Sequence, residues 1–320
     1  AAAALRELME RGLPATGTSV GPRFYHWVTG GVTPAALGAD MLASVLDQQA
    51  YSWIGSPLAV ELELVSLDWL KEMFGLPAAW SGVMTSGASM ANFVGLACAR
   101  QWWGETQGVD VAQDGLSSLP PVPVFGGGHI HASSVKALAM MGIGRSALRS
   151  IVADDTGRID LAALETGLKA LGGEPAIIIA GAGEVNAGAF DPIADMADLA
   201  RAHGAWLHVD GAFGLFAALS PRTAHLTAGT ERADSATVDG HKWLNVPYDS
   251  GYAFVADSQA HRACLSMEAG YIIKSEATGR DAVDWTPEWS RRARAFPTYA
   301  VIRSLGAKGI GDMVARCCDV

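Results

Sequence analysis

Short apolar runs rich in β-branched residues alternate with helical patterns through the middle of the 320-residue chain. This alternation constrains the fold strongly, because it is typical of a mostly parallel sheet with helices on both faces. The runs that predict strands are residues 123–125, 176–180 and 206–209, with two further candidates at 150–152 and 236–238. The intervals that predict helices are residues 60–74, 161–171 and 193–202. We therefore expect a three-layer α/β/α fold around a mostly parallel sheet.

The two ends of the chain differ from this middle region. Residues 1–50 are rich in Gly, Pro and aromatic side chains and predict an N-terminal arm, whereas residues 51–255 form the predicted large domain. From about residue 256 the alternation stops, so residues 256–320 predict the start of a smaller C-terminal domain that is incomplete at Val320. Within it, the Arg-rich segment 291–294 predicts a helix.

Helix boundaries follow from a few residues. The helix over residues 60–74 is expected to end at Gly75, since glycine is favoured just after a helix. The helix over residues 193–202 is expected to begin with Asp191 as N-cap and Pro192 at its first position.

Charge and composition favour a small-molecule partner. The formal net charge is −10, from 23 Lys and Arg against 33 Asp and Glu. It is spread without a charged tail, which argues against binding nucleic acid or an anionic membrane, and no apolar run approaches the roughly 18 residues of a membrane span. The 4 cysteines lack zinc-type spacing and disulfide density, and the alanine-rich start runs at once into charged residues. We expect a cytoplasmic protein.

Two residues that follow predicted strands indicate the chemistry. Asp210 comes directly after the strand 206–209, at the edge where open α/β sheets bind ligands. Lys242 follows the strand 236–238, and a desolvated lysine can lose its proton and attack a carbonyl. Alone, Asp210 is equally well a turn residue, and a lysine such as Lys242 is more often an exposed loop residue. Together they predict pyridoxal-5′-phosphate (PLP), which needs a lysine for its Schiff base and an acidic partner for its pyridine nitrogen.

The segment 85–92 suggests a phosphate site. Its small and hydroxyl residues precede the helical run 93–100, so free backbone N–H groups and the positive end of the helix dipole would face an anion. Taken alone, the segment is more often an ordinary Ser or Asn cap. It is neither a Walker A loop nor a GxGxxG motif.

Histidines in the loop 128–136 offer a ring to stack on a cofactor or an acid–base group. His129 and His131, with His208 and Asp210, also permit a metal-site interpretation. We predict no metal site, because a structural hydrogen bond accounts for His208 within its strand.

These motifs, in this order, resemble the group II PLP-dependent decarboxylases, relatives of aromatic-amino-acid and glutamate decarboxylases with the fold type I architecture of aspartate aminotransferase. The resemblance covers nearly the whole chain. The segments that carry it are 22–24, 56–57, 61–63, 86–91, 131–133, 190–191, His208-Val209-Asp210, His241-Lys242-Trp243 and Arg291-Arg292.

The resemblance implies roles for individual residues. Lys242 would be the Schiff-base lysine, Asp210 the partner of the pyridine nitrogen and His131 the residue stacked on the ring. The remaining cofactor contacts that it implies are Ala88 and Ser89 at the phosphate, Asp239 and His241 nearby, and Ala212 against the ring face. It also implies decarboxylation of an amino acid in a homodimer with active sites at the subunit interface.

The chain departs from the family pattern at two positions. Where aromatic-amino-acid decarboxylases carry a tyrosine that donates a proton after CO₂ leaves, this chain has Ala282, so the donor would be His131 or Lys242. A threonine that those enzymes place near the ring is replaced by Val185.

Aromatic residues near the arm suggest an aromatic substrate. They are Phe24, Tyr25, Trp27, Tyr51 and Trp53. We predict that Trp27 and Tyr51 bind substrate; the alternative is that these rings only pack the arm against its neighbour. Alternative activities on the same cofactor are aminotransfer, carbon–carbon lysis and aldehyde-forming decarboxylation, and a catalytically silent PLP-binding relative is a further alternative.

Overall fold

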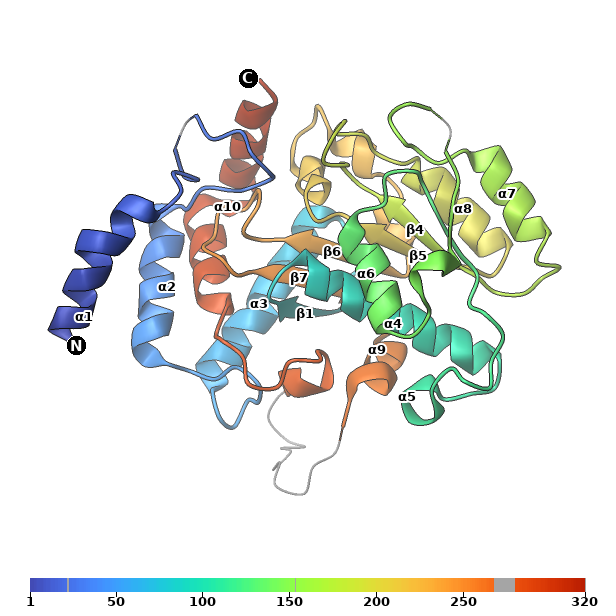
Figure 1. The fold of residues 1–320 in the computed structure, drawn as a ribbon, viewed down its shortest axis with the longest axis horizontal. Coiled ribbons are helices and arrows are strands. Elements are labelled where there is room, and N and C mark those ends of the chain that lie inside the picture. The colour runs from blue at the N-terminus through green and yellow to red at the C-terminus, as the bar shows by residue number, and fades with distance from the viewer. Residues whose placement is uncertain (22, 153, 268–279, 320) are drawn as a thin grey trace.

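The computed structural model describes residues 1–21, 23–152, 154–267 and 280–319 of the chain (Figure 1). Pro22, used in the family resemblance, and residues 268–279 of the predicted C-terminal domain lie outside this part. A seven-stranded sheet has the order β1-β7-β6-β5-β4-β2-β3. The strands are β1 Ser81–Thr85, β2 Val124–Gly126, β3 Leu148–Ser150, β4 Ile177–Gly181, β5 Trp206–Asp210, β6 Ser235–Asp239 and β7 Gly251–Val255. Only β7 runs antiparallel to its neighbours β1 and β6, which confirms the predicted mostly parallel sheet.

Helices cover both faces of the sheet, with α1 and α2 at one end of the molecule and α7 and α8 at the other (Figure 1). The α-helices are α1 Ala2–Glu7, α2 Pro34–Leu46, α3 Pro57–Phe74, α4 Ala88–Thr106, α5 Val111–Asp114, α6 Ala132–Met140, α7 Leu161–Lys169, α8 Ile193–Ala202, α9 Ser258–Leu265 and α10 Ala295–Cys318. A π-helical turn spans Leu8–Gly12, and 3₁₀ segments span Leu13–Ala15, Arg145–Ala147, Gly214–Leu219, Ala224–Thr227, Thr230–Arg232 and Ala282–Asp284. No described helix is both long and apolar enough to cross a membrane.

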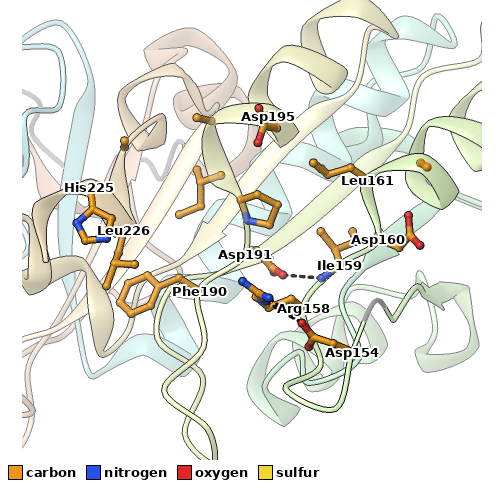
Figure 2. Close-up of a pocket in the computed structure, with 15 residues that line it drawn as sticks. Asp154, Arg158, Ile159, Asp160, Leu161, Phe190, Asp191, Asp195, His225 and Leu226 are labelled. Atoms are coloured by element: carbon orange, nitrogen blue, oxygen red, sulfur yellow. Dashed lines mark hydrogen bonds and ion pairs between the residues drawn. The ribbon is translucent and has the colours of Figure 1, made fainter.

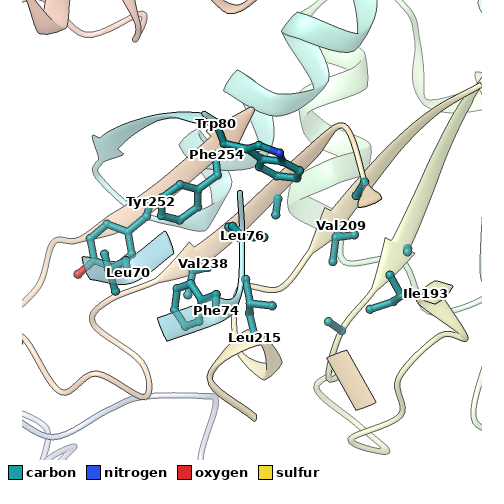
Figure 3. Close-up of a cluster of buried hydrophobic side chains, with 14 of the residues drawn as sticks. Leu70, Phe74, Leu76, Trp80, Ile193, Val209, Leu215, Val238, Tyr252 and Phe254 are labelled. Atoms are coloured by element: carbon teal, nitrogen blue, oxygen red, sulfur yellow. The ribbon is translucent and has the colours of Figure 1, made fainter. Parts of the chain in front are cut away.

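Side chains alternate between two apolar cores along the central strands. On β4, Ile178 points into a core shared with α3 and α8, whereas Ile177 and Ile179 point into a core shared with α4 and α6. Figure 3 shows part of the first core, where Phe74, Phe254 and Leu70 lie together. Because strand side chains alternate with period two, an apolar strand such as β4 needs helices on both sides.

The structure corrects two local predictions. Pro192, not Asp191, is the N-cap of α8, and the Asp191 carboxylate instead accepts hydrogen bonds from the backbone N–H groups of Ile159 (2.9 Å) and Gly181 (2.8 Å). Residues 291–294 are not a helix. Arg291 pairs with the buried Glu63, Arg292 forms an antiparallel bridge with Gln49, and α10 begins only at Ala295.

Strand prediction was incomplete at one side of the sheet. β1 and β7 were not predicted, and β3 ends at Ser150, where the predicted strand 150–152 begins. β1 lacks a β-branched run, since its sequence is SGVMT, yet all five of its residues are buried.

Candidate active site

A cavity of about 440 Å³ lies where β4, β5 and β6 end. Parallel strands direct their carboxyl ends to one edge of a sheet, and this edge carries both residues that the sequence singled out, Asp210 and Lys242. The lining residues are Trp27, Val28, Ser89, His129, Ile130, His131, Gly181, Ala182, Gly183, Glu184, Val185, Asp210, Ala212, Phe213, Asp239 and Lys242. The cavity thus includes seven of the ten predicted site residues. Ala88, His241 and Tyr51 are not among those that line it.

Asp210 ends β5 with its carboxylate almost fully buried, at 8% exposure. Its Oδ2 accepts hydrogen bonds from Asn92 Nδ2 (2.8 Å) and Ser134 Oγ (3.2 Å), and its Oδ1 accepts one from the backbone N–H of Ala212 (3.2 Å). These three donors are all uncharged groups. The carboxylate is therefore held by several donors while it still borders the cavity.

Lys242 lies just beyond β6, and its Nζ is 3.1 Å from Asp239 Oδ2. The other oxygen of Asp239 lies 3.3 Å from His241 Nε2 and accepts a hydrogen bond from the backbone N–H of Ala88 (2.5 Å). Burial alone would raise the pKa of Asp239, but hydrogen bonding and the charges of His241 and Lys242 outweigh burial and hold its pKa below the ordinary value. Asp239 is thus an anion beside the lysine.

The N-terminal arm crosses directly over the lysine loop. The N–H of Gly30 donates to the carbonyl of His241 (3.2 Å), and the N–H of Gly31 donates to Asn245 Oδ1 (2.6 Å). A Cβ atom on Gly30 would overlap the carbonyl oxygen of Lys242, so only glycine permits this approach. The arm thereby fixes the backbone that carries Lys242, a contact that sequence patterns did not indicate.

The predicted anion site falls at the N-terminus of α4. Gly87 precedes it with φ +147°, and α4 has no side-chain cap there. Ser89 of the first turn lines the cavity. A Cβ on Gly87 would come within 3.0 Å of His241 Cε1, so the turn leaves room only for backbone beside that ring.

His131 is the N-cap of α6, at the cavity wall. Its Nδ1 accepts a hydrogen bond from the backbone N–H of Ser133 (3.2 Å) and lies 2.7 Å from Ser133 Oγ. Since a ring nitrogen that accepts from a backbone N–H carries no hydrogen, the hydrogen of the neutral ring is on Nε2.

The first residues of the turn 183–188 form another part of the cavity wall. The Glu184 carboxylate accepts from the backbone N–H groups of Asn186 (2.8 Å) and Ala187 (2.7 Å), and its Oε2 lies 3.8 Å from His129 Nδ1. Burial favours a raised pKa for Glu184, yet these hydrogen bonds hold its pKa below the ordinary value. Val185 is half exposed at this wall.

The metal-site interpretation finds no support in the geometry of the histidines. His208 is fully buried, with Nδ1 2.8 Å from Ser235 Oγ and Nε2 3.0 Å from Asn92 Oδ1. In the described part of the chain, no group of three or more His, Cys, Asp or Glu residues is arranged to hold a metal ion.

A larger cavity of about 550 Å³ lies elsewhere, between the N-termini of α7 and α8 (Figure 2). Asp191 borders it, but that carboxylate is occupied by two backbone N–H groups. Neither Lys242 nor Asp210 lines it. The smaller cavity is therefore the candidate active site.

The donor set of the smaller cavity fits PLP. It combines a lysine amine, a buried carboxylate bordering the cavity, an imidazole at its wall and a 19-residue helix whose N-terminus has no side-chain cap. These groups match the aldehyde, ring nitrogen, ring face and phosphate of that cofactor.

Comparison with known proteins agrees with this fit. A family model described as the pyridoxal-dependent decarboxylase conserved domain matches residues 8–320. The aromatic-L-amino-acid decarboxylase of Bacillus atrophaeus is 33% identical over 291 residues, covering 89% of this chain and 58% of that protein. The L-2,4-diaminobutyrate decarboxylase of Rhizobium meliloti (strain 1021) is also 33% identical, over 89% of this chain and 56% of that protein. The chain thus spans little more than half the length of these relatives.

A solved structure shows the same fold. The crystal structure of Oryza sativa TDC with PLP and tryptamine has a TM-score of 0.89 to this chain at 27% identity, over 97% of this chain and 66% of that one. The chain belongs to the pyridoxal-dependent decarboxylase family.

Proposed function

We propose that this chain decarboxylates an L-amino acid with PLP held in the cavity around Lys242. The observation that carries the proposal is the convergence of Lys242, Asp210 and His131 on that cavity. When bound, PLP supplies an electron sink for the electron pair released as CO₂ leaves.

The residues of the chain have separate tasks in this proposal. Lys242 binds the cofactor aldehyde, and Asp239, 3.1 Å from its Nζ, orients the amine. Asp210 places a negative charge at the ring nitrogen. His131, with its hydrogen on Nε2, covers the ring and can deliver a proton within the cavity.

The phosphate is assigned to the N-terminus of α4. Ser89 borders the cavity there, and Ala88, Asp239 and His241 lie around the same turn. Ala212, whose N–H is bound to Asp210, borders the ring face.

Ala282 cannot supply the proton that relatives obtain from a tyrosine, because its side chain is a methyl group. It is buried, at 6% exposure. We therefore assign the proton to His131, or to Lys242 when its amine is free.

An aromatic substrate is the preferred choice. Apolar and aromatic side chains make up much of the wall, namely Trp27, Val28, Ile130, Val185 and Phe213. The similarity to an aromatic-L-amino-acid decarboxylase supports the same choice. Tyr51 does not border the cavity of the single chain, so its predicted role in binding substrate would depend on a second subunit.

Product analysis tests the activity. The protein is incubated with PLP and a panel of aromatic L-amino acids, L-2,4-diaminobutyrate and cysteine sulfinate, and products are identified by mass spectrometry. We expect CO₂ and the amine, with an aromatic amino acid preferred. A keto acid would indicate aminotransfer, and an aldehyde with ammonia would indicate aldehyde-forming decarboxylation. Cofactor binding without any product would indicate a silent relative.

A homodimer is part of this proposal. Large apolar side chains remain exposed along α1, the turn that follows it and α2. They are Leu5, Leu8, Met9, Leu13, Leu37, Met41, Leu42, Val45 and Leu46. Exposed apolar patches of this kind mark interaction sites. Light scattering on the purified protein should give twice the mass of one chain.

The proposed organisation is an arm over residues 1–50, a PLP-binding domain over residues 51–255 and a further segment over residues 256–320. A cytoplasmic location is proposed because all four cysteines are free thiols. Fractionation of cells that express the native gene tests this location.

A further inference from the structure

The side chain of Asn92 links the two sides of the candidate active site. Its Nδ2 donates to Asp210 Oδ2 (2.8 Å) and to Ser133 Oγ (3.1 Å), and Ser133 Oγ lies 2.7 Å from His131 Nδ1. Its Oδ1 accepts from Thr237 Oγ1 (2.7 Å) and lies 3.0 Å from His208 Nε2. One amide on α4 therefore contacts, directly or through one hydroxyl, both residues assigned to the cofactor ring.

The direction of each hydrogen bond is fixed by the ends of this network. An ionised carboxylate only accepts, so the amide nitrogen of Asn92 must face Asp210 and its oxygen must face His208. His208 then donates through Nε2 and accepts through Nδ1 from the hydroxyl of Ser235. Ser235 Oγ in turn accepts from Trp206 Nε1 (2.9 Å), which can only donate. The hydrogen bonds of this network therefore all point in one direction, from the Trp206 indole to Asp210.

Burial keeps water out of this hydrogen-bond network. Asn92, His208, Ser235 and Thr237 have 0% exposure. Burial lowers the pKa of His208 to about 4, against a smaller opposing effect of Asp210, so the ring is neutral at pH 7 as the network requires. In such surroundings a lost donor is not replaced by solvent, and hydrogen bonds that point the same way strengthen one another.

We propose that Asn92 is a positioning residue that holds the carboxylate of Asp210 aimed at the ring nitrogen of the cofactor. This inference rests on the proposed PLP site. Asn92 does not line the cavity. It acts by donating to Oδ2 of Asp210, the oxygen that Ser134 also contacts, whereas Oδ1 has the backbone N–H of Ala212 as its donor.

The test compares PLP with its deaza analogue, in which a carbon replaces the ring nitrogen. The ratio of their dissociation constants measures how much the ring nitrogen contributes to binding, independently of turnover. Wild type should bind PLP more tightly than the analogue, and Asp210→Ala should abolish the preference. Asn92→Leu, similar in size and unable to donate, should reduce the preference by about tenfold or more, since a hydrogen bond to a charged group is worth about that factor.

Gln101→Leu is the matched control. Gln101 is also a buried amide of α4, at 1% exposure. Its Nε2 donates to Glu105 and Asp110 and its Oε1 accepts from the N–H of Ala112, and it does not line the cavity. It should keep the wild-type preference. If Asn92→Leu does not fold, Ser134→Ala removes the second donor to the same oxygen and should lower the preference by a smaller factor.

The outcomes separate the two proposals. If wild type prefers PLP and Asn92→Leu keeps that preference in full, the role of Asn92 is overturned and the proposed function stands. Where Asn92→Leu does not fold, full retention of the preference in Ser134→Ala has the same meaning. Wild-type protein that binds neither compound overturns the cofactor site and the role of Asn92 together.

Discussion

Gly95 of α4 lies against the imidazole of His208 on β5, so closely that a Cβ atom on Gly95 would come within 2.7 Å of His208 Cε1 and 2.8 Å of its Nδ1. Glycine in a helix interior is unfavourable. Here it lets α4 approach the sheet closely enough for Asn92, one turn earlier, to reach both His208 and Asp210.

Gly95→Ala should therefore destabilise the protein in spite of the better helix propensity of alanine. We expect a loss of about 1–3 kcal/mol in the free energy of unfolding, the usual range for overpacking a buried site. Gly38→Ala is the matched control, because a Cβ on Gly38 of α2 meets nothing within 4 Å. That variant should gain about 0.5–1 kcal/mol. Urea denaturation of both variants measures the difference, and a stabilised Gly95→Ala would contradict the packing described.

Arg291 and Glu63 form an ion pair inside the protein, at 6% and 5% exposure. Arg291 also donates to the carbonyls of Ala50 (2.8 Å) and Met84 (2.6 Å), and Glu63 accepts from the N–H of Met84 (3.0 Å). Glu63→Leu leaves a buried guanidinium without its carboxylate. We expect it to lower the free energy of unfolding by about 3–5 kcal/mol.

Two comparisons test this ion pair by chemical denaturation. The double variant with Glu63→Leu and Arg291→Met should lose less stability than the two single losses added together, because no charge is left buried alone. Glu7→Gln breaks the exposed pair with Arg11 on the N-terminal segment and should change stability by less than about 0.5 kcal/mol. Additive losses in the double variant would show that the pair is not coupled.

His261 should make the protein less stable in mild acid. Burial, with the charge of Arg280, lowers the pKa of its ring from 6.5 to about 3. Between these values the unfolded chain binds more protons than the folded one, so the free energy of unfolding falls as the pH drops below about 6.5. The neutral ring donates through Nε2 to the carbonyl of Trp285 (2.8 Å), while its Nδ1 lies 2.8 Å from Ser81 Oγ.

His261→Gln removes the titrating ring and leaves an amide that can donate and accept in its place. Between pH 7 and pH 5 this variant should lose less stability than wild type in urea denaturation. His225→Gln, which changes an exposed histidine, should show the wild-type loss. An equal loss in His261→Gln and wild type would contradict the assignment.

Much of the sheet could be predicted because its central strands are buried on both faces and therefore continuously apolar. β4 is the clearest case, with Ile177, Ile178 and Ile179 in succession. β1 and β7 could not be predicted in the same way. β1 contains Ser81 and Gly82 and is recognisable only by its antiparallel pairing with β7, which is distant in sequence.

The residues of the candidate active site also differ in whether the sequence predicts them. Lys242 and Asp210 were predictable because they occur together, each just beyond a predicted strand, and a lysine with a carboxylate at that edge of the sheet has a clear chemical use. Asn92 and Ser134 were not, since a polar residue within a helix is usually exposed. Only the position of α4 and α6 against β5 shows that both donate to Asp210.

The central claim is that Lys242 carries the cofactor, and borohydride reduction followed by peptide mass spectrometry tests it most directly. The protein is incubated with PLP, reduced, digested and searched for lysine bearing the pyridoxyl phosphate group. We predict one modified peptide, containing Lys242, together with a visible absorption band before reduction that Lys242→Ala lacks. Modification of a different lysine in wild type, or an unchanged band in Lys242→Ala, would contradict the account.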